Sequence, residues 1–334
     1  MTTDPSVADP APVDTLGKSA LRRVAPMRLN LRDAGTVIGL IVIVIVFSLL
    51  SPVFLTERNL INIMQQSSIN ACIAIGMTLV IISGGIDLSV GATAAMSAVI
   101  SGTLIVDGLG VVPAIGVGLG IGILGGVFNG VLVAYAGLQP FIVTLGSLSL
   151  FRAIALILTG GSPVLGIPDS FRDLFSSNIA GLPMPVVLVA VVSLCAWTLL
   201  RKTPFGEYLL AIGGNAEAAR VAGVPIKWTK IGAYAISGFV SALAALILVG
   251  RLGAAEPILG NLWELDAIAA AAIGGASLMG GKGSITGTIL GAIILGALRN
   301  GLTLMNVQAF YQLLAIGIVI IVAMLIDRVT RGNN

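Results

Sequence analysis

Ten long apolar stretches alternate with short polar segments along the chain. A helix needs roughly 17–25 apolar residues to span a bilayer. Ten segments near that length are predicted as spans, at about Ala34–Leu55, Ser67–Ser83, Leu88–Val106, Val111–Ala136, Pro140–Thr159, Pro183–Leu200, Ile231–Val249, Leu265–Gly280, Ser284–Val307 and Phe310–Ile326. The second and eighth are short or interrupted by glycine, and such backbone must line a cavity or be buried in protein. The pattern predicts an all-α polytopic membrane protein with about ten transmembrane helices.

The basic residues predict that both termini are cytoplasmic. Ten spans place the two ends of the chain on the same side of the membrane. With the amino terminus inside, 13 of the 18 Lys and Arg residues fall in cytoplasmic segments and three outside. Cytoplasmic loops carry such an excess of basic residues. Residues 1–33, rich in Pro, Asp and Arg, are expected to be a mostly disordered cytoplasmic tail, and residues 34–334 a single membrane domain.

Glycines spaced by four residues predict close helix contacts in two spans. Gly122, Gly126 and Gly130 form one row, and residues 283, 287 and 291 form another. Small residues at this spacing make a groove that a second helix can approach closely. Packing within one subunit is favoured over a subunit interface.

Composition supports the membrane assignment and excludes several kinds of chemistry. The chain is 57% hydrophobic and 10% charged, with a mean hydropathy of +1.05, whereas a soluble domain carries about 25% charged residues. It has no histidine, so imidazole bases and imidazole metal ligands are absent. An intramembrane enzyme is disfavoured, since the embedded acids form no evident pair. The net charge of +3 is attributed to basic cytoplasmic loops that face anionic lipid. It is not taken as a sign of nucleic-acid binding.

Two glycine-rich motifs resemble nucleotide-binding loops but lack the required context. Gly120, Gly122 and Gly125 satisfy the dinucleotide-binding pattern inside an apolar span, with no preceding strand. In residues 275–284, glycine follows Lys282 where Ser or Thr would ligate Mg²⁺. No cofactor is therefore expected on this chain. If ATP drives the protein, a partner chain binds the ATP and Mg²⁺.

Asp87 is the only charged residue between Arg58 and Asp107. A charge at the centre of a membrane helix costs roughly 2.5–3.5 kcal/mol on insertion scales. Gly84 and Gly85 are expected to break the second span, and Asp87 to cap the third helix by accepting from a backbone N–H of the next residues. A second interpretation makes Asp87 part of an inner gate, and the two are compatible.

Other polar residues in apolar surroundings are candidates for the transport path or its gate. They are Ser89, Asn129, Gln139, Arg152, Glu264, Asp266, Lys282 and Asn300. Glu264 and Asp266 are alternatively expected to cap the eighth span. Arg152 and Arg299 are predicted to form an ion pair or to bind carbonyl groups rather than a substrate.

The one extensive hydrophilic loop, residues 201–230, contains a predicted short helix. Asn215 can cap this helix through its side chain, and Gly223 and Pro225 provide a stop. Such a helix could transmit force to a soluble partner, or could be an ordinary surface element.

Three segments resemble the permease subunits of ATP-binding-cassette importers, in particular the ribose-type sugar permeases. Residues 217–223 match the EAAxxxG core of the family's cytoplasmic coupling loop, although the later I-x-L-P portion is missing. The other two segments are SSINACIAIGMTLVIISGGIDLSVGA and ELDAIAAAAIGGASLMGGKGSITGTILGAIILGALRNGL. The resemblance extends from about residue 34 to the end of the chain.

This resemblance implies a monosaccharide permease of the bacterial inner membrane. It implies a pair of permease subunits with the path between them, ATP-binding subunits beneath and a periplasmic sugar-binding protein above. The coupling helix to the ATPase would comprise Asn215, Glu217, Ala218, Ala219, Arg220 and Gly223. Alternatives are an importer of nucleosides, furanose signalling molecules or branched-chain amino acids, and an ion-coupled secondary transporter that uses Asp87.

Overall fold

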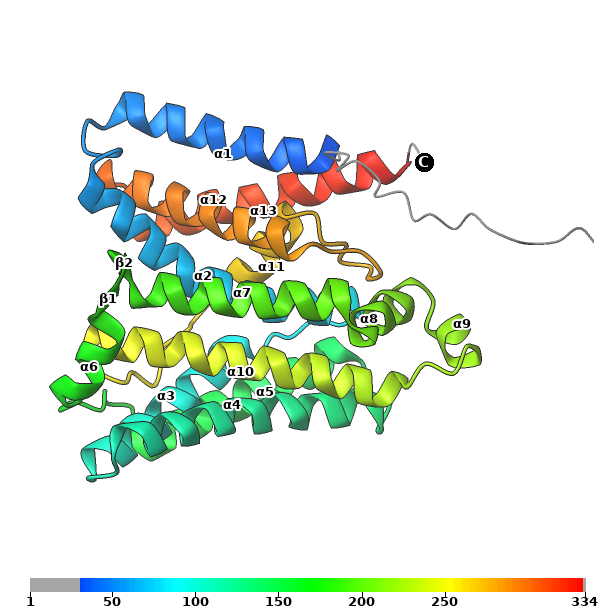
Figure 1. Cartoon of the computed structure of the whole chain (residues 1–334), viewed down its shortest axis with the longest axis horizontal. Helices are drawn as coiled ribbons and strands as arrows, with labels where there is room; N and C mark the ends of the chain where they lie inside the picture. The colour runs from blue at the N-terminus through cyan, green and yellow to red at the C-terminus, as the bar shows by residue number, and fades with distance from the viewer. Residues whose placement is uncertain (1–30, 333–334) are drawn as a thin grey trace, which may run out of the picture.

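The computed structural model describes residues 31–332 as a bundle of helices (Figure 1). Each predicted apolar segment overlaps one helix. These ten helices are α1 (Leu31–Leu50), α2 (Glu57–Ile82), α3 (Val90–Val106), α4 (Val111–Ala134), α5 (Pro140–Thr159), α7 (Met184–Lys202), α10 (Ile226–Leu252), α11 (Trp263–Ile273), α12 (Ile285–Leu304) and α13 (Ala309–Gly332). Within the described part, six helices are long and apolar enough to cross a membrane, and α1, α3 and α13 contribute shorter apolar stretches. Of the predicted tail at residues 1–33, residues 1–30 lie outside the described residues, and residues 31–33 already belong to α1.

The second and eighth segments differ from each other in the way they are built. Helix α2 has 26 residues and begins at Glu57, so the expectation of a short second span was wrong. Charged and amide side chains in its first ten residues make this stretch less apolar than the rest of the helix. Helix α11 has only 11 residues and ends before Gly274, which confirms the broken eighth span.

The segments between the long helices form five further elements. They are α6 (Asp169–Ser176), the antiparallel pair β1 (Asn178–Ile179) and β2 (Leu182–Pro183), α8 (Pro204–Gly214) and α9 (Ala216–Val221). The hydrophilic loop at 201–230 is thus largely helical. Helix α9 lies at the end of the bundle where the chain terminates after α13, and α6 and the strand pair lie at the opposite end (Figure 1).

Helix α2 is the central helix of the bundle and packs against α7, α10, α11 and α12. Its most apolar window is 89% buried, whereas the windows of α4, α5 and α7 are 22–28% buried. The outward-facing apolar side chains of these helices suit contact with lipid. Their helical backbones suit it as well, because in lipid each backbone group must find its hydrogen-bond partner within the protein. The core therefore surrounds α2, and the apolar outer surfaces belong to peripheral helices.

Glycines bring α4 and α10 into backbone contact. A Cβ atom on Gly126 would meet the carbonyl of Tyr234, and one on Gly130 would lie 2.7 Å from the Ile231 Cα. Gly287 similarly lies against the Gly274 backbone. Both glycine rows therefore make contacts within the chain, as predicted.

Candidate functional site

A buried polar network surrounds the break between α2 and α3. Helix α2 ends at Ile82, and Gly84 turns the chain with φ of +80°. This conformation favours glycine. The turn is followed by Asp87, whose carboxylate is buried. Asp87 Oδ1 accepts from the Ser89 N–H at 3.0 Å and the Ser89 hydroxyl at 2.6 Å, and Oδ2 accepts from the Ser237 hydroxyl at 2.8 Å.

The predicted hydrogen bond from the Ser89 N–H to the Asp87 carboxylate is confirmed, but the prediction that Asp87 is the N-cap residue of α3 was wrong. The N-cap residue of α3 is Ser89, and Asp87 lies two residues before it. The carboxylate accepts from the backbone two residues ahead, as in an Asx-turn. It therefore orders the approach to α3 and also ties this turn to α10 through Ser237.

Asn129 extends the network to α4 and α5. Its side-chain amide donates to the Ser89 hydroxyl at 2.8 Å, and its carbonyl oxygen accepts from the Ser147 hydroxyl. The structure thus brings together Asp87, Ser89 and Asn129 from the predicted set. Sequence reasoning missed Ser147 and Ser237, because a serine in a membrane helix commonly bonds its own helix backbone and gives no distinguishing signal.

Arg152 joins α5 to the segment before α11. Its guanidinium donates to the carbonyls of Pro257 at 2.8 Å and Leu259 at 2.7 Å, and Glu264 lies near enough for their charges to interact. The expectation that Arg152 binds carbonyl groups is confirmed.

Asp266 forms an ion pair with Arg299 instead of capping α11. Both carboxylate oxygens accept from Arg299 Nη2 at 2.7 Å, whereas the N-cap residue is Leu262 and no side chain caps this helix. The predicted cap was therefore wrong, because the carboxylates lie one and three residues inside α11. The predicted ion pair of Arg299 is confirmed, and it joins α11 to α12.

The remaining candidates lie apart from this network. Asn300 and Asn59 exchange two amide hydrogen bonds of 2.8 and 2.9 Å between α12 and α2, which is a structural link. Gln139 is exposed at the start of α5 and its side chain has no hydrogen bond among the described residues. Lys282 is exposed in the turn between α11 and α12. The predicted residues thus form several clusters and no single site.

Two chain turns, α2–α3 and α11–α12, meet beside the end of α8. The Gly281 N–H donates to the Ile82 carbonyl at 2.9 Å, which joins the α11–α12 turn to the end of α2. A Cβ atom on Gly213 would meet both of these groups, and one on Gly280 would lie 3.0 Å from the Gly84 Cα. We call residues 84, 213, 280 and 281 the glycine junction. It links the α2–α3 turn and the α11–α12 turn, where the second and eighth apolar segments are broken off by glycines, to the end of α8 just before α9.

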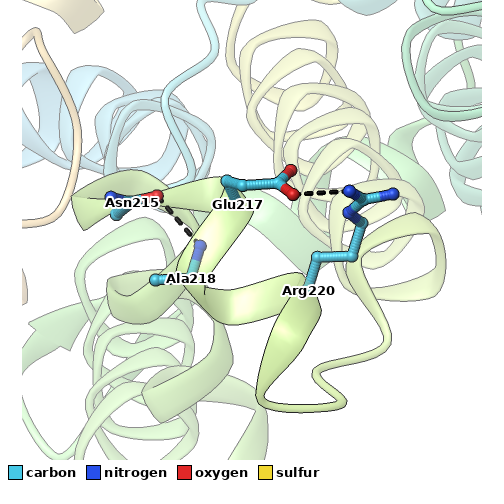
Figure 2. Close-up of polar contacts among 4 residues, drawn as sticks. All are labelled: Asn215, Glu217, Ala218 and Arg220. Carbon is cyan, nitrogen blue, oxygen red and sulfur yellow. Dashed lines mark hydrogen bonds and ion pairs between the residues drawn. The ribbon is translucent and has the colours of Figure 1, made fainter.

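Helix α9 projects beyond the ends of the long helices (Figure 1). Asn215 accepts from the Ala218 N–H at 3.0 Å, and Glu217 pairs with Arg220 at 2.5 Å (Figure 2). Gly223 follows with φ of +80°. The predicted cap and stop are confirmed. Ala219 is buried against the bundle, while Val221 is 81% exposed, so α9 has one anchored face and one free face.

Membrane helices around a buried polar network, with two broken segments and a projecting short helix, define a multi-pass transport protein. Residues 59–324 match the family described as "Branched-chain amino acid transport system / permease component". The chain belongs to this family of membrane permease components, and it is the permease rather than an enzyme of such a system.

Curated relatives agree with this family over nearly the whole chain. The chain is 43% identical over 300 residues to the ribose import permease protein RbsC of Bacillus subtilis, covering 89% of this chain and 93% of the relative. It is 42% identical to RbsC of Escherichia coli K12 over 89% of this chain and 94% of the relative. The D-allose transport system permease protein AlsC of that strain is 39% identical, covering 88% and 91%. No solved structure matches the chain.

Proposed function

We propose that the chain is the membrane subunit of an ATP-driven importer for a monosaccharide such as ribose. The observation that carries this proposal is the 43% identity to a ribose import permease over 89% of the chain. The similarity to a D-allose permease supports the broader class of monosaccharides. The substrate is thus a small polyhydroxylated ring.

The energy source is a separate ATP-binding subunit that docks on α9. Val221 on the free face of α9 is 81% exposed, and Trp228 in the first turn of α10 is 69% exposed at the same end of the bundle, which supports this role. Exposed apolar groups of this kind suit a protein interface. ATP and Mg²⁺ belong to the partner, and Asn215, Glu217, Ala218, Ala219, Arg220 and Gly223 form the coupling helix.

The glycine junction supplies a route from α9 to the broken segments. Displacement of α8 would press Gly213 on the Ile82 carbonyl and Gly281 N–H, which lie at the ends of the two turns. Close-packed backbone transmits displacement because it has little room to adjust. The turn that contains Asp87 would thereby follow the ATPase and act as the inner gate.

A second copy of the chain completes the path. An apolar groove of about 670 Å³ lies between α2, α7 and α12, and Ser67, Ser68, Ser193 and Thr286 add hydroxyl groups to its lining. A groove with an apolar wall and a few hydroxyls suits the passage of a sugar that must not bind tightly.

The α9 end of the bundle faces the cytoplasm, and all ten apolar helices contribute to the membrane domain. The basic loop around α8 and α9 supports this orientation. A periplasmic sugar-binding protein would then dock at the end that carries α6 and the strand pair. The chain would reside in the inner membrane of a bacterium.

Reconstitution tests the proposal directly. The permease is copurified from its native host in mild detergent, and its complex is placed in liposomes with ATP inside and liganded binding protein outside. We expect an ATP-binding subunit to copurify and radiolabelled monosaccharide to enter only with ATP. Uptake driven by a proton or sodium gradient without an ATPase would instead establish a secondary transporter. ATP-driven uptake of a nucleoside or amino acid alone would overturn the substrate class.

A further inference from the structure

A polar cavity lies between α2, α10, α11 and α12, near the end of the bundle that carries α6. Its volume is about 360 Å³, and its lining is Asn62, Gln66, Ile69, Asn70, Leu248, Arg251, Trp263 and Arg299. Helix α2 begins at this end of the bundle, and α10 ends there (Figure 1). The cavity is therefore on the side opposite α9. Its volume is in the range of small-molecule sites, roughly 300–1,000 Å³.

Three amide side chains form one wall of this cavity. Asn62, Gln66 and Asn70 follow one another at four-residue intervals on α2, so they lie on one face of the helix. Asn62 and Gln66 are exposed at the mouth, while Asn70 is 8% exposed. None of the three side chains has a hydrogen-bond partner among the described residues, although each carries donors and an acceptor. These amides are free to bind a ligand.

The opposite wall supplies an aromatic ring and two guanidinium groups. Arg299 lines the cavity and is held by both oxygens of Asp266. Arg251 adds a second guanidinium at the rim, and Trp263 adds an indole. Because Asp266 offsets one of the two positive charges, the cavity offers mainly neutral amides and hydrogen-bond donors.

We propose that this cavity binds a monosaccharide on the outer side of the transport path. The amides of α2 and the guanidinium of Arg299 match neighbouring ring hydroxyls, which both donate and accept. The indole of Trp263 provides an apolar surface for the C–H face of the sugar. This inference rests on the proposed function and adds a location to it. Because Asn62 and Gln66 are exposed at its mouth, the site is open on the outer side and should bind its ligand weakly.

Fluorescence of Trp263 provides a direct test of binding. The chain has three tryptophans, so a Trp197→Phe/Trp228→Phe variant in nanodiscs leaves Trp263 as the only reporter. D-ribose, D-allose, L-arabinose and D-galactose are titrated to millimolar concentration, with trimethylamine N-oxide at equal osmolality as a solute lacking hydroxyls. We expect a saturable change with at least one sugar and none with the control solute. The absence of a saturable change with all four sugars would overturn the proposal.

Matched variants connect the cavity to transport. Gln66→Ala and Asn70→Leu remove amides from the lining, whereas Gln65→Ala changes a neighbouring amide that is outside it. We expect the first two to weaken sugar binding and lower ATP-driven uptake about tenfold, as for loss of a hydrogen bond. Gln65→Ala should match the parent. If the parent imports a monosaccharide and all three variants match it, the cavity assignment alone is wrong. If the parent imports no monosaccharide, the proposed function itself is wrong.

Discussion

The Asp87 carboxylate holds the turn before α3 against α10, because its two oxygens accept from different elements. Ser89 supplies two donors to one oxygen and Ser237 supplies one to the other. A buried donor that loses its acceptor costs about 1–3 kcal/mol. The side chain at this position therefore needs acceptors more than it needs charge.

Substitution of Asp87 separates these two requirements. Asp87→Asn keeps an acceptor for Ser89 and can donate to the Ser237 hydroxyl, so we expect a folded protein with much of its transport activity. Asp87→Leu leaves three donors without acceptors and should lower the unfolding free energy by about 3 kcal/mol. Thermal unfolding in detergent and uptake in liposomes provide the two measurements. Loss of all uptake in a normally folded Asp87→Asn variant would mean that the charge itself is required.

The ion pair of Asp266 and Arg299 allows a second test at this scale. Asp266→Asn leaves the guanidinium without its counter-charge, and breaking a buried pair from one side costs about 3–5 kcal/mol. The double variant Asp266→Leu/Arg299→Met removes both charges and should be more stable than the single variant. Unfolding midpoints of the two variants check this order. A single variant as stable as the parent would show that the pair contributes no net stability.

Individual residues differed in how well the sequence predicted them. Asp87 and Arg152 were recognisable because a charge in an apolar run needs a partner. Asn59 was not among the candidates because it follows Glu57 and Arg58, outside the predicted apolar segment. The cap expected at Asp266 was wrong because its partner, Arg299, lies 33 positions away, and sequence spacing carries no record of that contact.

Between elements, the contact of α4 with α10 depends on the absence of side chains. Gly122 and Gly126 face the α10 backbone at Gly238 and Tyr234. Association of helices in lipid relies on such close packing, since burial from water contributes little there. The two helices therefore act as one rigid pair.

A single added methyl group tests this pair. Gly126→Ala places a Cβ atom against the Tyr234 carbonyl, and overpacking of this kind costs about 1–3 kcal/mol. Gly120→Ala is a matched control in the same helix, because no atom lies within 4 Å of its added Cβ. We expect a lower unfolding midpoint for Gly126→Ala only. Equal midpoints would mean that α4 and α10 separate without cost.

Most long helices were predictable as elements, because their length and hydropathy are properties of a local sequence window. The start of α2 was not, since its amides face an internal cavity and so resemble surface residues. Helix α6 and the strand pair were also missed. Their residues lie in a polar segment where short elements depend on packing against α7 and α10.

For the molecule as a whole, the glycine junction connects the α9 end to both broken segments. Gly213 has no space for a side chain, because the Ile82 carbonyl and Gly281 N–H occupy its surroundings, whereas Gly214 has no atom within 4 Å of an added Cβ. Neighbouring glycines in one turn thus differ sharply in their packing.

This difference predicts a defect in coupling. Gly213→Ala should reduce ATP-driven uptake about tenfold, equivalent to about 1.4 kcal/mol, while ATP hydrolysis by the complex continues. Gly214→Ala should transport like the parent. Uptake and ATP hydrolysis are measured in the same liposomes, with membrane levels compared by immunoblot. Equal uptake by the two variants would show that movement reaches the gate by another route.

The junction also determines at what stage of synthesis the turn after α2 can form all of its hydrogen bonds. The Ile82 carbonyl has its partner 199 positions later, at the Gly281 N–H. Until the ribosome has delivered that glycine and the insertion machinery has released α11, the end of α2 lacks this hydrogen bond. A nascent chain arrested before Gly281 would therefore carry an open inner turn, exposed to the proteases that survey newly inserted membrane proteins.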